Sequence, residues 1–181
     1  MRRLVITLLV SIPSLVRAQP GLTGATEPED EPITSYVQPG AIVGLIHANS
    51  ANSDAAYGAL SLEGGHRIGI SPVWLHGLVA VGGMGDLDQG SGPNSYSEVV
   101  AGVESRTCAF HGIACGVAAI DVGIRHEYLM SDHFDSFNGV IVPRLGLDIG
   151  SRKFRVRPAI EYVFGTDGYG AALSLAGAYT W

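Results

Sequence analysis

The sequence predicts an all-β fold, a closed antiparallel up-and-down barrel of eight strands. From about residue 36 onward, short apolar or alternating runs are separated by clusters of Gly, Asn, Asp, Ser and Pro, which is typical of strands and turns. No stretch between these runs suits a helix of ordinary length, which argues against a parallel sheet with crossover helices. An even number of antiparallel strands brings both termini to one end, as an up-and-down barrel requires.

The predicted strands differ in how clearly they alternate. In order, they span 39–48, 56–65, 73–83, 96–107, 116–128, 139–149, 154–164 and 170–181. The third alternates poorly, because Trp74, Leu75 and Leu78 do not sort to one face. Pro143 and Pro158 fall inside adjacent strands, and because proline lacks an N–H group we expect a local bulge or pleat defect there.

Two segments precede the predicted barrel at 39–181. Residues 1–18 combine Arg2 and Arg3 with an apolar run and a small residue at Ala18, the pattern of a secretory signal peptide. The alternative is a retained membrane anchor, for which the run is short. Residues 19–38 are rich in proline and acid and predict a flexible leader, or alternatively a docking arm for a basic partner.

The charge balance argues against nucleic acid as a partner. The chain has 11 basic residues, and removal of the three arginines in residues 1–18 leaves 8 against 17 acidic residues, a net charge of −9. A surface with this balance repels a polyanion.

Charged side chains share one face of the four strands between residues 96 and 164, and apolar side chains share the other. The charged set is Glu98, Glu104, Arg106, Asp121, Arg125, Glu127, Arg144, Asp148, Arg155, Arg157 and Glu161. Periodicity alone does not decide which face points into the barrel. A soluble lipocalin-like barrel that binds a small ligand would have its charges outside.

Two observations favour the placement of the charged face inside the barrel. Every basic residue of the charged set is arginine, which suits enclosed, multiply hydrogen-bonded ion pairs better than lysine does. Aromatic residues also cluster near strand ends, with aliphatic residues between them, as in a bilayer with two interfaces. They are Phe154, Tyr179 and Trp181 near one rim and Tyr128, Tyr162 and Phe164 near the other. We expect Tyr36 and Trp74, at neighbouring strand starts, to join the first rim.

The last strand supports a membrane location. The segment GYGAALSLAGAYTW alternates and ends in Trp181, and it resembles the C-terminal signature of Gram-negative outer-membrane β-barrels. The chain as a whole resembles the small eight-stranded outer-membrane barrels of the OmpA and OmpX type. This resemblance implies a transmembrane barrel that is exported through the inner membrane, recognised by the barrel-insertion machinery through its last strand, and surrounded by outer-membrane lipid and lipopolysaccharide.

The expected function is structural, or a surface interaction in the cell envelope. An eight-stranded barrel is only wide enough for side chains to fill it, so we expect a plugged polar interior, no large pore and a monomer. The predicted outer loops, 49–55, 84–95, 129–138 and 165–169, are short and offer little area for a tight protein partner.

Cys108 and Cys115 bracket a short turn between two predicted strands, on the periplasmic side if the N-terminus is periplasmic. In an exported protein this pattern favours a disulfide. The alternatives are a metal site with His111 or a redox pair, but a fourth metal ligand is lacking and redox cysteines are usually closer together.

The second functional class is a lipid A-modifying outer-membrane hydrolase. The candidates for a nucleophile, base and orienting acid are His126, Ser131 and His133, with Glu127. The His-x-Ser element of such deacylases is absent from the sequence, so we assign no catalytic residue. Asp86 begins a run like a calcium loop, but Gly90 occupies the position of a ligand, so we expect neither metal nor cofactor.

Overall fold

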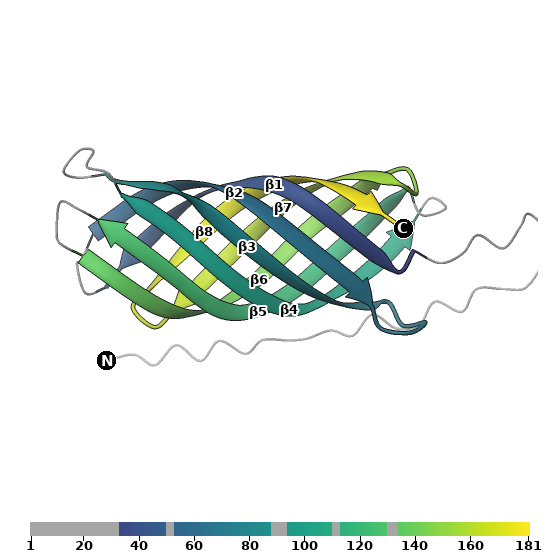
Figure 1. The fold of residues 1–181 in the computed structure, drawn as a ribbon, viewed down its shortest axis with the longest axis horizontal. Helices are drawn as coiled ribbons and strands as arrows, with labels where there is room; N and C mark the ends of the chain where they lie inside the picture. The colour runs from purple at the N-terminus through teal and green to yellow at the C-terminus, as the bar shows by residue number, and fades with distance from the viewer. Residues whose placement is uncertain (1–32, 50–52, 88–93, 110–112, 130–133) are drawn as a thin grey trace, which may run out of the picture. The chain divides into compact units, whose positions relative to one another are not determined.

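The chain forms a closed antiparallel barrel of eight strands (Figure 1). The computed structural model describes residues 33–49, 53–87, 94–109, 113–129 and 134–181. The strands are β1 (Ser35–Ala48), β2 (Ser53–Arg67), β3 (Val73–Asp86), β4 (Ser95–Ala109), β5 (Ala114–Leu129), β6 (Phe134–Gly150), β7 (Phe154–Gly165) and β8 (Gly168–Thr180). None of these described segments forms a helix long and apolar enough to cross a bilayer.

Each strand pairs with the next along the chain, and β8 pairs with β1 to close the barrel. The backbone N–H groups of Thr34 and Ser35 both donate to the carbonyl oxygen of Trp181, so the two ends of the barrel chain are fastened together. We call this end of the barrel, where β1 begins and β8 ends, the terminus end. Because β1 already begins at Ser35, the last residues of the predicted leader 19–38 belong to the barrel. The predicted signal segment 1–18 lies outside the described residues.

The two faces of the sheet have opposite chemistry. In β7, Phe154, Val156 and Ile160 are exposed on the outside, while Arg155 and Arg157 are buried inside. The same holds for the other strands with clear alternation, so the alternative of a soluble barrel with its charges outside is wrong for this chain. A soluble protein of this size buries such residues, so the apolar exterior requires an apolar surrounding.

The interior is largely apolar in the half away from the terminus end. In β3, Leu78, Ala80 and Met84 point inward, while Val79 and Val81 point outward. Both faces of this part of β3 are therefore apolar, which is why its sequence alternates poorly. These inward residues join Ile42, Ile46, Ala55, Tyr57, Ala59, Tyr96, Val100, Val140, Val142, Val163 and Ala172 in one cluster.

Tyr36 and Trp74 lie inside the barrel, so their expected place in the outer aromatic rim is wrong. Tyr36 is 2% exposed and Trp74 is 5% exposed. The Tyr36 ring covers Gly65, its direct partner on β2, where an added Cβ would lie 2.3 Å from the ring. The inward Tyr36 ring fits here because the neighbouring strand contributes glycine, which leaves the space a side chain would fill.

The two strand prolines interrupt the ladder between β6 and β7 without shifting it. Pro143 and Pro158 both lack a partner in this ladder, which pairs Ile141 with Phe164 before the first gap and Arg144 with Glu161 after it. The register is the same on both sides of the gaps. The expected bulge is therefore absent, and what remains is a local loss of hydrogen bonds.

The contact between Tyr36 and Gly65 predicts a position-specific effect. We expect Gly65→Ala to lower the free energy of unfolding by about 1–3 kcal/mol, because the buried ring has little room to move. Gly64→Ala is the matched control, since a Cβ there meets its nearest atom at 3.8 Å. Urea unfolding of both variants refolded into lipid vesicles measures the difference, and equal loss in the two would contradict this packing.

Candidate functional site

The structure places all eleven side chains of the predicted charged set inside the barrel. They extend inward from β4, β5, β6 and β7, because alternate residues of a strand point to the same face. Two charged or titratable residues join them that the sequence pattern did not indicate, Glu63 on β2 and His76 on β3. Both come from strands whose alternation is weak. In the sequence, only the isolation of each polar residue within an apolar or glycine-rich run could have indicated that it points inward.

Arg144 connects the centre of this network. Its Nη1 donates to Glu63, and its Nη2 donates to Asp121 Oδ2 at 2.9 Å. His76 Nε2 hydrogen-bonds the other oxygen of Asp121, and Glu161 lies opposite Arg144 in the strand ladder. One guanidinium therefore joins carboxylates from two strands that are far apart in sequence.

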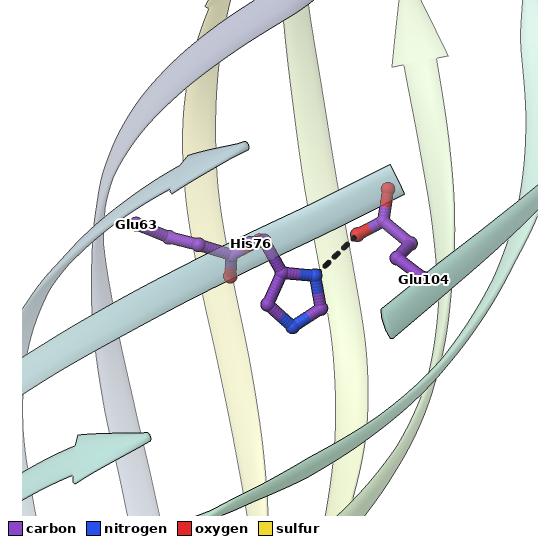
Figure 2. A group of neighbouring side chains, drawn as sticks. All are labelled: Glu63, His76 and Glu104. Atoms are coloured by element: carbon purple, nitrogen blue, oxygen red, sulfur yellow. Dashed lines mark ion pairs between the residues drawn. The ribbon is translucent and has the colours of Figure 1, made fainter. Parts of the chain in front are cut away.

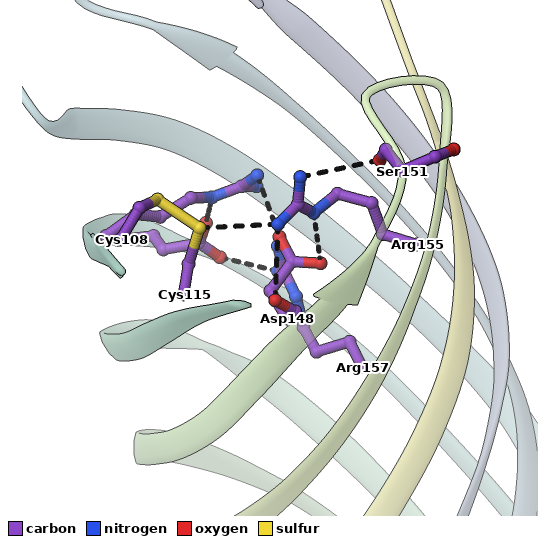
Figure 3. The surroundings of a disulfide bond; sticks show 8 residues. Cys108, Cys115, Asp148, Ser151, Arg155 and Arg157 are labelled. Carbon is purple, nitrogen blue, oxygen red and sulfur yellow. Dashed lines mark hydrogen bonds and ion pairs between the residues drawn. A yellow bond between two sulfur atoms is a disulfide. The ribbon is translucent and has the colours of Figure 1, made fainter. Parts of the chain in front are cut away.

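Arg157 extends the network toward the terminus end. Its Nη1 donates to Glu104 at 2.7 Å and its Nη2 donates to Asp148 at 3.2 Å. Asp148 also accepts from Arg106 and Arg155, and Figure 3 shows Arg155 and Arg157 beside it. Asp148 is thus a shared acceptor for β4 and β7.

A smaller group lies in the opposite half of the barrel. Arg125 donates to Glu98 Oε2 from both Nε and Nη2, at 2.9 and 2.6 Å, and its Nη1 is 3.7 Å from Glu127. The Tyr96 hydroxyl donates to the same Glu98 oxygen at 2.9 Å, and the Tyr96 ring stacks on Tyr57. Aromatic rings therefore enclose this charge pair.

This arrangement is suited to holding the wall together rather than to chemistry on a substrate. A buried charge is costly unless it is paired and hydrogen-bonded, and arginine satisfies several acceptors at once. Because most partners come from different strands, most of these ion pairs also fix the position of one strand relative to another.

One cluster has the composition of a metal site. Ligand atoms of Glu63, His76 and Glu104 lie within 4.8 Å of one another (Figure 2). Glu63 already accepts from Arg144, and Glu104 accepts from Arg157 and Arg106. A divalent cation would have to enter among these guanidinium groups against their repulsion, so we assign the three residues to the ion-pair network.

The predicted catalytic candidates do not form one site in the described residues. His126 lies on the outward face, where its ring stacks on Phe137 with centroids 4.4 Å apart. The next residue, Glu127, is buried on the inward face. The pair therefore points to opposite sides of the wall, and Ser131 and His133 lie outside the described residues.

Cys108 and Cys115 form a disulfide, so that prediction is confirmed. The two residues are direct partners in the ladder between β4 and β5. Arg155 Nη2 lies 3.3 Å from Cys115 Sγ, which brings the disulfide to the edge of the charged network (Figure 3).

Aromatic side chains lie on the outward face near both ends. At the terminus end, Tyr179 contacts Phe154 and Trp181, with ring centroids 5.3 and 5.9 Å apart. Toward the other end, Tyr162 and Phe164 are exposed, and Tyr128 is half-buried.

The fold is that of the small eight-stranded outer-membrane barrels. Neisserial surface protein A superposes with a TM-score of 0.61 at 12% identity, covering 81% of this chain and 97% of that one. Ail, the attachment invasion locus protein of Yersinia pestis, superposes with a TM-score of 0.54 at 14% identity, covering 82% of this chain and 99% of that one. No protein-family model and no curated protein sequence matches the chain. The likeness at these identities is one of fold.

The central network predicts a strong effect of removing one partner. We expect Arg144→Met to destabilise the barrel by about 3–5 kcal/mol, because Glu63 and Asp121 would remain buried without their cation. Adding Glu63→Gln to this variant removes one of the orphaned charges and is expected to recover part of the loss. Urea midpoints in lipid vesicles measure both, and a double variant no more stable than the single one would contradict the ion-pair account.

The disulfide predicts a redox-dependent stability. Closing the short loop between the cysteines constrains the unfolded chain, so we expect reduction to lower stability by about 2–3 kcal/mol. Denaturant unfolding with and without reductant measures the shift, and Cys108→Ser/Cys115→Ser is the control that no longer responds. Two free thiols in the oxidised, denatured protein would contradict the bond.

Proposed function

We propose that the protein is an integral outer-membrane barrel with a plugged interior and a structural or surface-interaction role in the cell envelope. The observation that carries this proposal is the orientation of the two faces. The outward face of the barrel is a band of Val, Ile, Leu, Ala, Pro and Gly between aromatic residues, while the charges are buried inside. A bilayer is the surrounding that matches such a band.

The same proposal assigns each end of the barrel to one side of the outer membrane. The terminus end lies in the periplasm, and residues 1–18 direct export through the inner membrane. The outward band contacts outer-membrane lipid and, in the outer leaflet, lipopolysaccharide, while the strand ending at Trp181 is recognised by the insertion machinery. The protein acts as a monomer, because a closed barrel leaves no strand edge for a second copy to extend.

Surface contacts, if they are the function, are made at the end opposite the termini. Asp54 and Asp167 lie there, and Asp167 lines the same small pocket as the inward Glu127. A structure of Ail holds a heparin analogue, sucrose octasulfate. The acidic residues of this chain do not favour such a polyanion, and for the same reason nucleic acid is not a partner. We propose no catalytic role, because His126 and Glu127 face opposite sides of the wall.

A plugged interior predicts that the protein does not conduct ions through a large pore. In planar bilayers we expect no sustained nanosiemens-scale conductance, because the apolar cluster and the paired charges together fill the lumen. A general porin reconstituted in parallel is the positive control. Stable large openings that depend on the purified protein would overturn the plugged interior, and recovery of the protein in the soluble periplasmic fraction would overturn the membrane location.

A further inference from the structure

The interior is hollowed at the terminus end by a pocket of about 230 Å³. Its wall is built from Arg67, Trp74, Arg106 and Arg155 together with the disulfide between Cys108 and Cys115. Three arginines therefore line one mouth, beside an indole ring and a disulfide. No carboxylate belongs to the described lining residues of this pocket.

The arginines at this mouth differ in how their charges are balanced. Arg106 pairs with Glu104 and Asp148, and Arg155 pairs with Asp148. Arg67 forms no ion pair within the described chain. Its side chain donates only to the carbonyl oxygens of Ser71 and Ile70, at 2.8 and 2.9 Å, which hold it in place without cancelling its charge.

Arg106 is held in a fixed position at the pocket wall. Its guanidinium carbon lies 4.5 Å from the centroid of the Tyr36 ring and 4.1 Å from that of Trp74. Nε donates to Glu104 and Nη1 donates to Asp148, while the side chain is 8% exposed. Nη2 has no hydrogen-bond partner among the described residues. A buried donor of this kind is rare in proteins, and it points to an acceptor that the described residues do not supply.

We propose that this pocket is an oxyanion site that takes a phosphate group. Guanidinium N–H groups form strong, charge-assisted hydrogen bonds with phosphate oxygens, and the interaction is stronger where water is partly excluded. Arg106 Nη2 is the donor that has no partner among the described residues. The indole of Trp74 and the disulfide give the site an apolar wall, so it also accommodates a ligand whose phosphate is attached to an apolar portion. Two sources fit this chemistry, a free phosphate and the headgroup of an anionic phospholipid.

The fluorescence of Trp74 offers a direct readout of ligand binding in the pocket. In a Trp181→Phe background Trp74 is the sole tryptophan, and its fluorescence is followed while inorganic phosphate is added to the barrel in a maltoside detergent at constant ionic strength. We expect a saturable change, weakened about tenfold by Arg67→Gln, the size of effect that loss of one charged hydrogen-bond donor produces. Arg67 is chosen because it lies outside the buried ion pairs, so its loss leaves the barrel folded, which a heat-dependent gel shift verifies.

Lys153→Gln is the matched control, because it removes one positive charge from an exposed turn at the same end without touching the pocket. The affinity of this variant for phosphate is expected to stay within about twofold of that of the parent, as for exposed, screened charges.

A second experiment uses phosphate-free buffer and micelles doped with short-chain phosphatidylglycerol. A response to inorganic phosphate that depends on Arg67 identifies free phosphate as sufficient, and a response to doped micelles alone identifies the headgroup. No saturable response in either experiment, or equal weakening by Arg67→Gln and Lys153→Gln, would overturn the proposal.

Discussion

The cost of burying charge inside a narrow closed barrel is the constraint on which the rest of this structure depends. Arginines on β4 to β7 solve it by bridging carboxylates on different strands, with Arg144 joining Glu63 and Asp121 and with Arg157 joining Glu104 and Asp148. Because a strand alternates, fixing the charges inside forces the apolar residues outside. The apolar, membrane-facing exterior and the interior of paired charges therefore both follow from the orientation of the strands.

The interior is not uniform along the barrel axis. The half near the termini is held by a large network of directional ion pairs. The other half is filled mainly by apolar side chains such as Ile42, Leu78 and Val142, with a smaller charged group around Arg125. Apolar packing tolerates small shifts better than charge-assisted hydrogen bonds do, so the ion pairs constrain the register of the strands more tightly. The same half carries the disulfide, the fastening between Thr34 and Trp181, and the cationic mouth.

The sequence was most informative where the two faces differ in chemistry. The strands from 96 to 164 alternate charged with aliphatic residues, so their faces could be predicted, and the aromatic residue at 181 pointed to the membrane. β2 and β3 were harder because both of their faces are largely apolar or glycine, which hid Glu63 and His76. Tyr36 and Trp74 were misplaced for a different reason. Inside the barrel, Tyr36 occupies the space left by Gly65, and both rings contact the guanidinium of Arg106. Such cross-strand contacts depend on register, which composition does not contain.

The most direct test of the account is to ask which face of the wall meets lipid. In a background without Trp74 and Trp181, Leu145→Trp places a single indole at an outward position that is 64% exposed in the present structure. Reconstituted in vesicles of brominated phosphatidylcholine, this residue should be strongly quenched, whereas Trp74 as sole tryptophan should be protected inside the barrel. Protection at position 145 together with quenching at Trp74 would contradict the orientation of the two faces, and with it the membrane barrel.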